Sequence, residues 1–285
     1  MDLDRRLALM LLAAPVLFIL AFFAVPFGVV VLESFHTSDG AWGLSQYAKL
    51  FSSWFYLETL WFTFKIALWV TAASFLIGYP LAYYMTRIVT SRWLRRLLYI
   101  IVITPLFTSN IVRSFGWMIL LGRRGLVNDT LLATSMIDQP LQLLSNELSI
   151  VIGMTYIMTP FMVLTITAVL QNIDTTLEVA ARDLGANWLT TFTKVTFPLS
   201  LPGVVAGTLI VFTLTVSAYV TPSILSGGKK TVMSMLIFQQ YASIFDFRFG
   251  ATLSVALLIT TLLLITLYRL AGKPRARKPE QGIPT

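Results

Sequence analysis

Six long apolar stretches alternate with polar segments along the sequence. They cover residues 7–32, 60–84, 97–121, 148–170, 203–225 and 250–270. Each stretch supplies the roughly 20 residues that a helix needs to cross a hydrocarbon core of about 30 Å. A helix also satisfies its backbone hydrogen bonds within one segment, as lipid requires. The pattern therefore predicts an all-α, polytopic membrane protein in which residues 1–285 form a single domain with six transmembrane helices.

The first stretch, 7–32, lies at the N-terminus, where a secretory signal peptide would lie, but it differs from a signal peptide in other respects. It follows Arg5 and Arg6, but it is about twice as long as the apolar region of a signal peptide and has no clear small-x-small cleavage site. We therefore expect a retained first transmembrane helix.

Composition supports a lipid environment and narrows the chemistry. Of the 285 residues, 56% are hydrophobic and 12% are charged, and the mean hydropathy is +0.79, whereas soluble domains are about 45–50% apolar and about 25% charged. The net charge is +8, but the basic residues flank apolar runs, so we expect an anionic bilayer and not nucleic acid as the partner. The lack of cysteine and the single histidine, His36, argue against disulfides, thiol nucleophiles and His/Cys metal sites.

The distribution of Lys and Arg predicts which ends of the spans face the cytoplasm. With the N-terminus inside, thirteen basic residues flank the inner ends of the spans and seven flank the outer ends. Positive charge gathers on the cytoplasmic side, so we expect both termini there. Lys65 lies near the outer end of the second span, where its ammonium group could reach the headgroups. In this topology the polar segments 33–58 and 122–147 lie outside, the segment 171–202 lies inside, and the basic, proline-rich tail 273–285 is a disordered cytoplasmic end.

Several spans contain residues that bend helices or let them approach closely. Pro80, Pro105 and Pro160 lie within spans, where proline frees a backbone carbonyl and bends the helix. Gly203 and Gly207 open the fifth span with the small-xxx-small spacing that brings two helix backbones together. We interpret this glycine pair as a packing contact within the chain.

The inner segment 171–202 carries helix signals of its own. Thr175 precedes Glu178 at the spacing of a capping box, which predicts a helix that starts there. Gly185 is suited to the left-handed conformation that ends a helix, and Asn187 can cap a second helix. The segment therefore predicts two short helices that meet at a glycine elbow.

The second of these helices has an apolar face that water alone would not stabilise. The residues that recur at the spacing of one helix face are Trp188, Phe192 and Val195. On the first helix, Ala180 and Ala181 leave the backbone almost bare. We expect Pro198 and Pro202 to end the second helix before the next span. The segment either docks to another protein or folds against its own membrane domain and the lipid interface.

This segment resembles a loop of a known transporter family. It reads Ala180-Ala181-x-x-x-Gly185 and, after nine further residues, Val195-x-Phe197-Pro198. The pattern is similar to the EAA loop, EAA-x3-G-x9-I-x-L-P, of ABC-importer permeases. Val179 replaces the glutamate of that pattern, with Glu178 one position earlier, and Val195 and Phe197 replace isoleucine and leucine. The resemblance implies that an ATPase contacts this loop at the following residues: Glu178, Ala180, Ala181, Asp183, Gly185, Ala186, Asn187, Trp188 and Pro198.

Other parts of the chain are similar to the permeases of spermidine/putrescine importers. The similar features are Pro105, the segment 110–117, the run 156–161 and the pair Gly227-Gly228. The resemblance implies a type I importer fold in the bacterial inner membrane, with a second permease, two ATPase subunits and an external solute-binding protein as partners. It also implies that ATP and magnesium bind to the ATPases, that this chain holds no cofactor and catalyses no reaction, and that the cargo is a polyamine or a related small polar solute.

Polar and aromatic residues of three spans are candidates for the pore lining. They are Asn110, Arg113 and Trp117, which share one helix face by their spacing, together with Tyr156 and Tyr219. A charged Arg113 needs water or a partner, so it either faces the pore or lies near headgroups and a loop carboxylate such as Asp129. A cationic pore would repel a polyamine, which leaves ferric iron, a phosphonate or an amino-acid derivative as alternative cargo.

Two other function classes fit the sequence less well. A proton-coupled secondary transporter usually needs an ionisable group at mid-membrane, and none of the thirteen acidic residues lies well inside a span. A sodium site made of carbonyls and hydroxyls escapes this argument, so a secondary transporter stays the alternative of another class. A membrane enzyme would need a nucleophile, a metal or an acid–base pair in a span, and the run Gly228-Lys229-Lys230-Thr231 does not complete a P-loop.

Overall fold

The computed structural model describes the backbone of residues 2–271 and the side chains of Leu7 and of residues 10–270. Within this part of the chain, five helices are long and apolar enough to cross a membrane, or six if one bent pair counts as a single span. The regular structure described is helical, apart from an isolated bridge between His36 and Trp42. The prediction of an all-α membrane protein is confirmed, and the predicted tail 273–285 lies outside the described residues.

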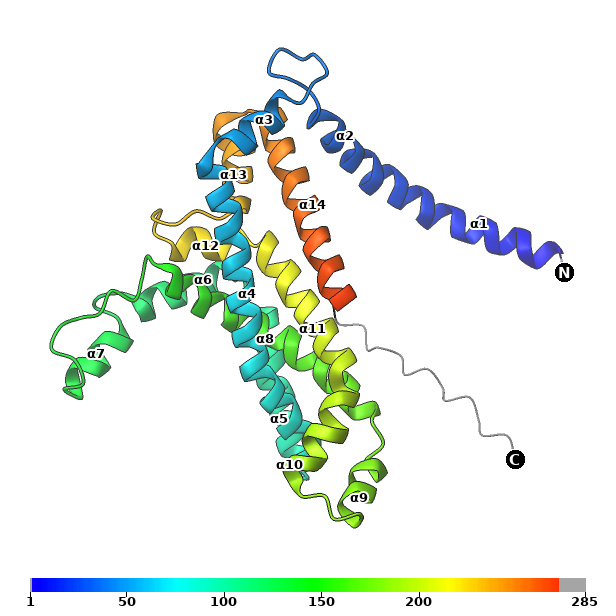
Figure 1. The fold of residues 1–285 in the computed structure, drawn as a ribbon, viewed down its shortest axis with the longest axis vertical. Helices are drawn as coiled ribbons and strands as arrows, with labels where there is room; N and C mark the ends of the chain where they lie inside the picture. The colour runs from blue at the N-terminus through cyan, green and yellow to red at the C-terminus, as the bar shows by residue number, and fades with distance from the viewer. Residues whose placement is uncertain (1, 272–285) are drawn as a thin grey trace, which may run out of the picture.

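Three long helices form the centre of the bundle (Figure 1). They are α4 (Trp54–Tyr83), α8 (Glu147–Asn172) and α11 (Phe197–Ser217), and they pack against one another. The core that they share is apolar and includes the fully buried Val70, Met162 and Val211. A fourth long helix, α14 (Phe247–Ala271), joins them through a second core around Phe249.

Small residues set the distance between α8 and α11. A Cβ added to Gly203 would lie 2.9 Å from the Cβ of Val169, and one added to Gly207 would lie 2.8 Å from the Sδ of Met162. Glycine at both positions therefore lets the two backbones approach. The predicted packing contact within the chain is confirmed.

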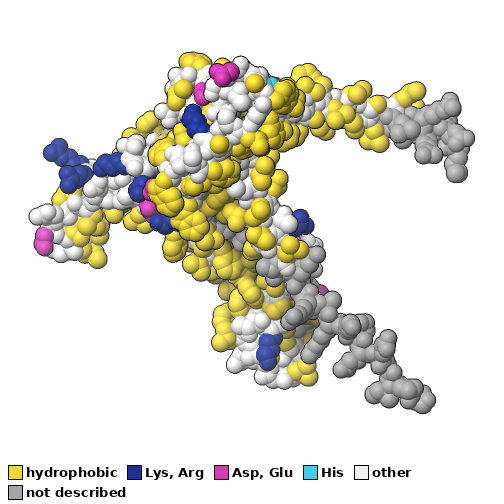
Figure 2. Space-filling model, turned by 45° about the horizontal axis from the view of Figure 1, so that its top comes forward, with side chains coloured by type: hydrophobic (Ala, Val, Ile, Leu, Met, Phe, Trp, Pro, Cys, Tyr) yellow, Lys and Arg dark blue, Asp and Glu magenta, His cyan; other side chains and the backbone are white. Residues whose placement is uncertain are grey.

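The N-terminal helix leaves the bundle as a separate arm (Figure 1). Its parts are α1 (Asp2–Ile19), the π-helical turn Leu20–Ala24 and α2 (Val25–Glu33), and α2 contacts α14. No part of its apolar window is buried in the described structure, and Figure 2 shows hydrophobic side chains along the visible face of the arm. The predicted first span is present, but it packs against little of its own chain.

The predicted third span, 97–121, is broken. The helical elements in this region are α5 (Arg92–Ile103), the 3-10 turn Thr104–Phe107, α6 (Asn110–Leu121) and α7 (Leu126–Ala133). The chain bends by 101° at the break. Pro105 has no backbone N–H to continue the first helix, and the hydroxyl of Ser109 caps the next one by accepting a hydrogen bond from the N–H of Ile111 at 3.3 Å. The predicted third span is therefore present only as this bent pair, because the apolar run contains a stop signal followed by a start signal.

The predicted fifth span, 203–225, begins and ends earlier than expected. A continuous helical run extends from Trp188 to Ser217. The elements of this region are α10 (Trp188–Thr191), the π-helical turn Phe192–Thr196, α11 and the separate α12 (Val220–Leu225). Pro198 and Pro202 lie inside the run, so the prediction that they end a short helix is wrong. The π-turn ends two residues before Pro198, and such a turn departs from the α-helical hydrogen bonding that proline cannot continue.

Two short helices, α3 (Ser45–Ser52) and α13 (Met233–Gln239), lie at the end of the bundle where α4 starts (Figure 1). Beyond α13 the chain forms a further π-helical turn, Gln240–Ile244. The ammonium group of Lys65 donates to Oε2 of Glu147 at 2.7 Å. Lys65 therefore pairs with a carboxylate at the start of α8, and its side chain remains 40% exposed.

Candidate functional site

The inner segment forms the predicted elbow. α9 (Thr176–Asp183) is followed by Gly185, whose φ is +86°. The backbone N–H groups of Gly185 and Ala186 donate to carbonyls of α9 at 2.9 and 3.0 Å, which is the Schellman arrangement that needs a left-handed residue. Asn187 then caps the next helix, because its Oδ1 accepts a hydrogen bond from the N–H of Thr190 at 2.8 Å. The elbow and the second cap are confirmed.

The capping box predicted at the start of α9 is wrong. Thr175 makes no side-chain cap, and Oδ1 of Asp174 instead accepts a hydrogen bond from the backbone N–H of Thr176 at 2.9 Å. Hydrogen bonds from Thr176 lower the pKa of the exposed Asp174 carboxyl, because they stabilise its charged form. Glu178 is not needed at the helix end, and its side chain contacts the membrane domain.

Glu178 is a buried carboxylate held by two other elements. Its Oε1 accepts hydrogen bonds from Nε of Arg87 at 2.9 Å and from Oγ1 of Thr196 at 3.0 Å. Arg87 lies in the π-helical turn Tyr84–Ile88 at the end of α4, and Thr196 lies in the turn Phe192–Thr196 before α11. The side chains of Arg87 and Glu178 are each only 9% exposed. The carboxylate therefore ties the loop to the end of α4 and to the start of α11.

The apolar face of the second helix packs mainly on its own membrane domain. Phe192 meets Tyr79 and Tyr83 of α4 edge-on, with ring centroids 5.8 and 5.4 Å apart. Trp188 stacks on Phe192 at 5.9 Å, and its indole N–H donates to the hydroxyl of Tyr83 at 3.3 Å. Packing against its own membrane domain therefore explains why the second helix carries Phe192. Trp188 is 56% exposed, so part of its ring remains accessible to another protein.

An apolar surface is left at the tip of the loop, near the labels α9 and α10 in Figure 1. We name it the loop tip; its exposed residues are Leu177, Val179, Ala180, Asp183, Leu184, Gly185, Trp188 and Leu189, and the polar Arg182 and Asn187 between them are exposed as well. Leu184 is 90% exposed. Clustered apolar side chains on a surface are typical of a site that another protein covers. Behind this surface Ala181 and Ala186 are partly buried, and Pro198 is exposed on the following helix.

The candidate pore residues of α6 form one group with Tyr156. Asn110, Arg113 and Trp117 follow one another along α6, and the Trp117 ring meets the Tyr156 ring edge-on at 5.6 Å. Nη2 of Arg113 donates to Oδ1 of Asn110, whereas its Nε and Nη1 are enclosed without a hydrogen-bond partner among the described residues. No ion pair joins Arg113 to Asp129 in this part of the chain, so the expected pairing with that loop carboxylate does not form. A shielded guanidinium group needs an anion or water beside it.

Tyr219 belongs to a different group. It follows the break after α11 and stacks on Phe238 of α13 at 4.3 Å. Both rings line a hollow of about 520 Å³ between α11, α13 and α14, to which Ser217, Ser234 and Thr261 contribute hydroxyl groups. The candidate pore residues thus form two separate groups. One group lies on α6 and α8, and the other, Tyr219, lines this hollow.

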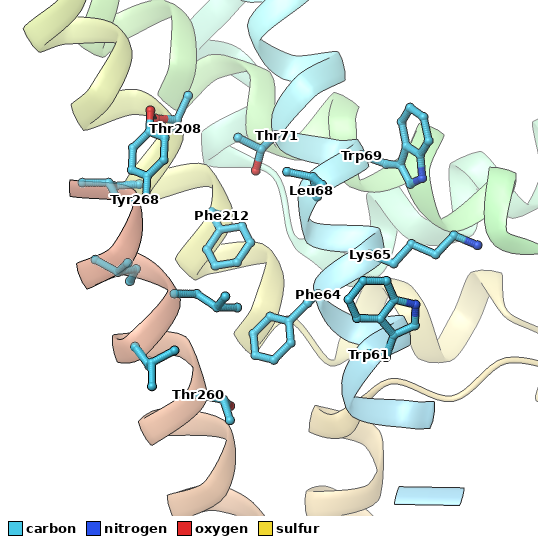
Figure 3. Close-up of a pocket in the computed structure, with 14 residues that line it drawn as sticks. Trp61, Phe64, Lys65, Leu68, Trp69, Thr71, Thr208, Phe212, Thr260 and Tyr268 are labelled. Atoms are coloured by element: carbon cyan, nitrogen blue, oxygen red, sulfur yellow. Dashed lines mark hydrogen bonds between the residues drawn. The ribbon is translucent and has the colours of Figure 1, made fainter. Parts of the chain in front are cut away.

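A groove of about 590 Å³ runs between α4, α11 and α14 (Figure 3). Its lining is almost entirely apolar and includes Trp61, Phe64, Trp69 and Phe212. Figure 3 shows the ammonium group of Lys65 pointing away from the groove. This lining suits apolar side chains or acyl chains and offers few groups to a polar solute.

The sequence offers no local signal for Arg87 or Thr196 as site residues. Arg87 lies 91 positions before Glu178 and is one of several basic residues at the predicted inner ends of the spans. A contact between residues so far apart in the chain leaves no periodic pattern or motif from which a single sequence could predict it. For metals, the described residues hold no group of three or more His, Cys, Asp or Glu side chains that could bind an ion.

The chain also matches a family of transport proteins. Residues 74–273 match the model of the binding-protein-dependent transport system inner membrane component. The chain belongs to this family. It is 31% identical over 265 residues to the spermidine/putrescine transport system permease protein PotB of Haemophilus influenzae, with 91% of this chain and 92% of the relative covered. It is equally identical over 265 residues to PotB of Escherichia coli, with 91% and 95% covered.

A solved structure has the same fold. A bacterial ABC transporter that imports the acidic polysaccharide alginate contains a chain with a TM-score of 0.75 and 17% identity, covering 97% of this chain and 98% of that one. The family and the fold confirm an inner-membrane permease subunit of a binding-protein-dependent ABC importer. ATP hydrolysis belongs to separate subunits, so this chain is a transport subunit and not an enzyme. The alternative of a secondary transporter is not supported.

Arg113→Ala is expected to change uptake and to leave the complex assembled. The guanidinium group makes no ion pair with the described residues, so its removal costs little packing. A hydrogen bond to a charged group contributes about 1.5–3 kcal/mol, so uptake of a cargo that binds Arg113 through an anionic group should fall about tenfold or more in proteoliposomes that hold the complete importer. Arg124→Ala, at an exposed arginine of the outer segment, is the control. Loss of assembly in Arg113→Ala alone would identify Arg113 as a structural residue.

Proposed function

We propose that this permease forms half of a translocation pore and couples it to ATP hydrolysis through the loop tip. The complete importer contains a second permease, two cytoplasmic ATPase subunits and a periplasmic solute-binding protein. ATP and magnesium bind to the ATPases, and both termini of this chain lie in the cytoplasm. The observation that carries the proposal is the exposed apolar loop tip on a glycine elbow, directly beside a buried link into the bundle.

The connection between the loop and the pore helices supports this role. The helix that starts at Trp188 continues without a gap to Ser217, so a shift of the loop tip moves the inner end of α11 directly. When the two ATPases close on ATP, the loop tip moves with them. The bundle then changes from inward-open to outward-open as packed helices shift against one another.

The N-terminal arm supports a second permease as partner. Most of its described apolar side chains are exposed, as Phe22 and Phe23 illustrate with 72% and 70% exposure. In the complex, the first span wraps around the second permease, while the other five spans form this half of the pore.

For the cargo, we propose a polyamine or a related small polar solute, because the similar PotB proteins are named as spermidine/putrescine permeases. A second candidate is a solute with an anionic group: chelated ferric iron, a phosphonate or an amino-acid derivative. It is favoured by the two guanidinium nitrogens of Arg113 that lack a partner among the described residues. Arg113→Ala separates these candidates, because it should lower uptake of an anion and should not lower uptake of a polyamine.

Purification of the tagged chain from its native host in mild detergent tests the proposal. We expect an ATPase and a second permease to remain bound, and both can be identified by mass spectrometry. The solute-binding protein encoded next to the genes of these subunits then narrows the range of possible cargo molecules. A chain that is recovered alone, and that transports in liposomes without ATP, would contradict the proposal. That result would identify the protein as a secondary transporter.

A further inference from the structure

Two irregular turns on two long helices meet at one carboxylate. The π-helical turn Tyr84–Ile88 ends α4, the turn Phe192–Thr196 precedes α11, and Glu178 projects from α9 to both. One oxygen, Oε1, accepts a hydrogen bond from each turn, from Arg87 at 2.9 Å and from Thr196 at 3.0 Å. π-Turns are rare and frequently occur at functional sites. Their meeting at a buried acid therefore requires an explanation beyond packing.

The arginine holds a further element. Nη2 of Arg87 donates to the carbonyl of Ile173, where α8 ends, at 3.2 Å. One guanidinium group thus binds both α9 and the end of α8 while it remains attached to α4. Water reaches little of the pair, since both side chains are 9% exposed, and attraction between charges is stronger when water is excluded.

Glu178 is the one side chain of α9 that hydrogen-bonds to another helical element in the described part of the chain. The remaining contacts of the loop with α4 are aromatic, such as Phe192 on Tyr83. Aromatic contacts tolerate small shifts between rings, whereas opening a buried ion pair leaves a charge without compensation. The ion pair therefore decides whether the loop moves together with α4 or slides along it.

We infer that the Arg87–Glu178 ion pair is the positioning link that transmits movement of the loop tip to α4 and α11. In this role Glu178 acts on these helices, whereas the family resemblance implies that it contacts the ATPase. The inference rests on the proposed function of the loop tip as the ATPase contact. Val179, at the position of the family's glutamate, is exposed and leaves the loop tip apolar there.

Glu178→Gln tests the link in the complete importer, reconstituted in proteoliposomes with its ATPases and binding protein. Glutamine keeps the size of the side chain and can accept the hydrogen bond from Thr196, but it lacks the charge that holds Arg87. We expect ATP hydrolysis to continue and transport per ATP hydrolysed to fall about tenfold, the size typical of coupling between contacting groups. Arg87→Gln should give the same loss. The exchange of both residues, Arg87→Glu with Glu178→Arg, should restore part of the ratio.

The matched control is Arg96→Gln, which removes an exposed arginine at the same end of the bundle and should leave the ratio unchanged. A merely structural role would lower the amount of assembled complex and leave transport per ATP as in the wild type. An unchanged ratio in both single variants, or losses that simply add in the exchanged pair, would overturn the inference.

Two further observations keep the test decisive. If Glu178→Gln fails to assemble, Glu178→Asp and Arg87→Lys keep both charges, change the length of the link, and should lower the same ratio. A wild-type chain that retains no ATPase contradicts the proposed function itself, and that result is visible before any variant is compared.

Discussion

Gly185→Asp is expected to lower transport by the assembled importer at least about tenfold while the membrane domain stays folded. Gly185 has φ +86°, and an added Cβ would meet no atom of its own chain within 4 Å. The substitution therefore costs the chain only the strain of a left-handed residue, about 1–2 kcal/mol. It places a charged side chain at the centre of the loop tip, where a contact residue can contribute about 2 kcal/mol or more to binding. Uptake and ATP hydrolysis, measured together in proteoliposomes, report the uncoupling.

A second glycine provides the control for this substitution. Gly228 has φ +75° and also has open space around an added Cβ, but it lies in the segment between α12 and α13, far along the chain from the loop tip. Gly228→Asp carries the same local strain and charge and should transport normally. Normal uptake by Gly185→Asp would count against docking of an ATPase at this loop.

Gly203→Leu is expected to destabilise the bundle by about 3 kcal/mol or more, the upper range for overpacking a tight contact. An added Cβ alone would lie 2.9 Å from Cβ and Cγ2 of Val169 and 3.1 Å from the backbone carbonyl of Thr165. Neither a β-branched side chain nor a helix backbone can move aside easily. The melting temperature and the yield of monodisperse complex in detergent measure the effect.

Gly28→Leu is the matched control for this prediction. Gly28 also lies in an apolar helix, but an added Cβ would meet no atom within 4 Å. When this chain is purified without the second permease, which the first span is proposed to contact, its leucine variant should melt near the wild type. A Gly203→Leu variant that is as stable as Gly28→Leu would show that α8 and α11 can separate without cost.

The sequence alone locates the long, unbroken helices well. The apolar runs 60–84, 148–170 and 250–270 correspond to α4, α8 and α14, because a lipid core demands a minimum apolar length whatever the helix packs against. Breaks are harder to predict. Pro80 and Pro160 lie inside continuous helices, whereas Pro105 lies at a sharp bend. The same residue type has opposite outcomes, so a proline in an apolar run does not by itself place a break.

In the candidate site, too, local features can be predicted from the sequence, whereas contacts between distant residues cannot. Gly185 and Asn187 act on backbone groups within a few positions, so their conformations can be predicted from local spacing. The partner of Glu178 lies 91 positions away, and the local signal assigns this acid to a capping box that does not form. Tyr219 stacks on Phe238 instead of joining Arg113, because the break after α11 redirects the chain. Contact of the loop tip with an ATPase stays a prediction.

The π-turns also make the effect of deleting a residue different from the effect of substituting one in this protein. A π-turn holds one residue more than the α-helical turn it replaces, and each residue inserted or removed rotates the rest of a helix by about 100°. The number of residues in Tyr84–Ile88 and Phe192–Thr196 thus sets the rotational phase at which Arg87 and Thr196 face Glu178. A one-residue gap at either place in an alignment with a relative consequently marks a change of phase, which no exchange of side chains can reproduce.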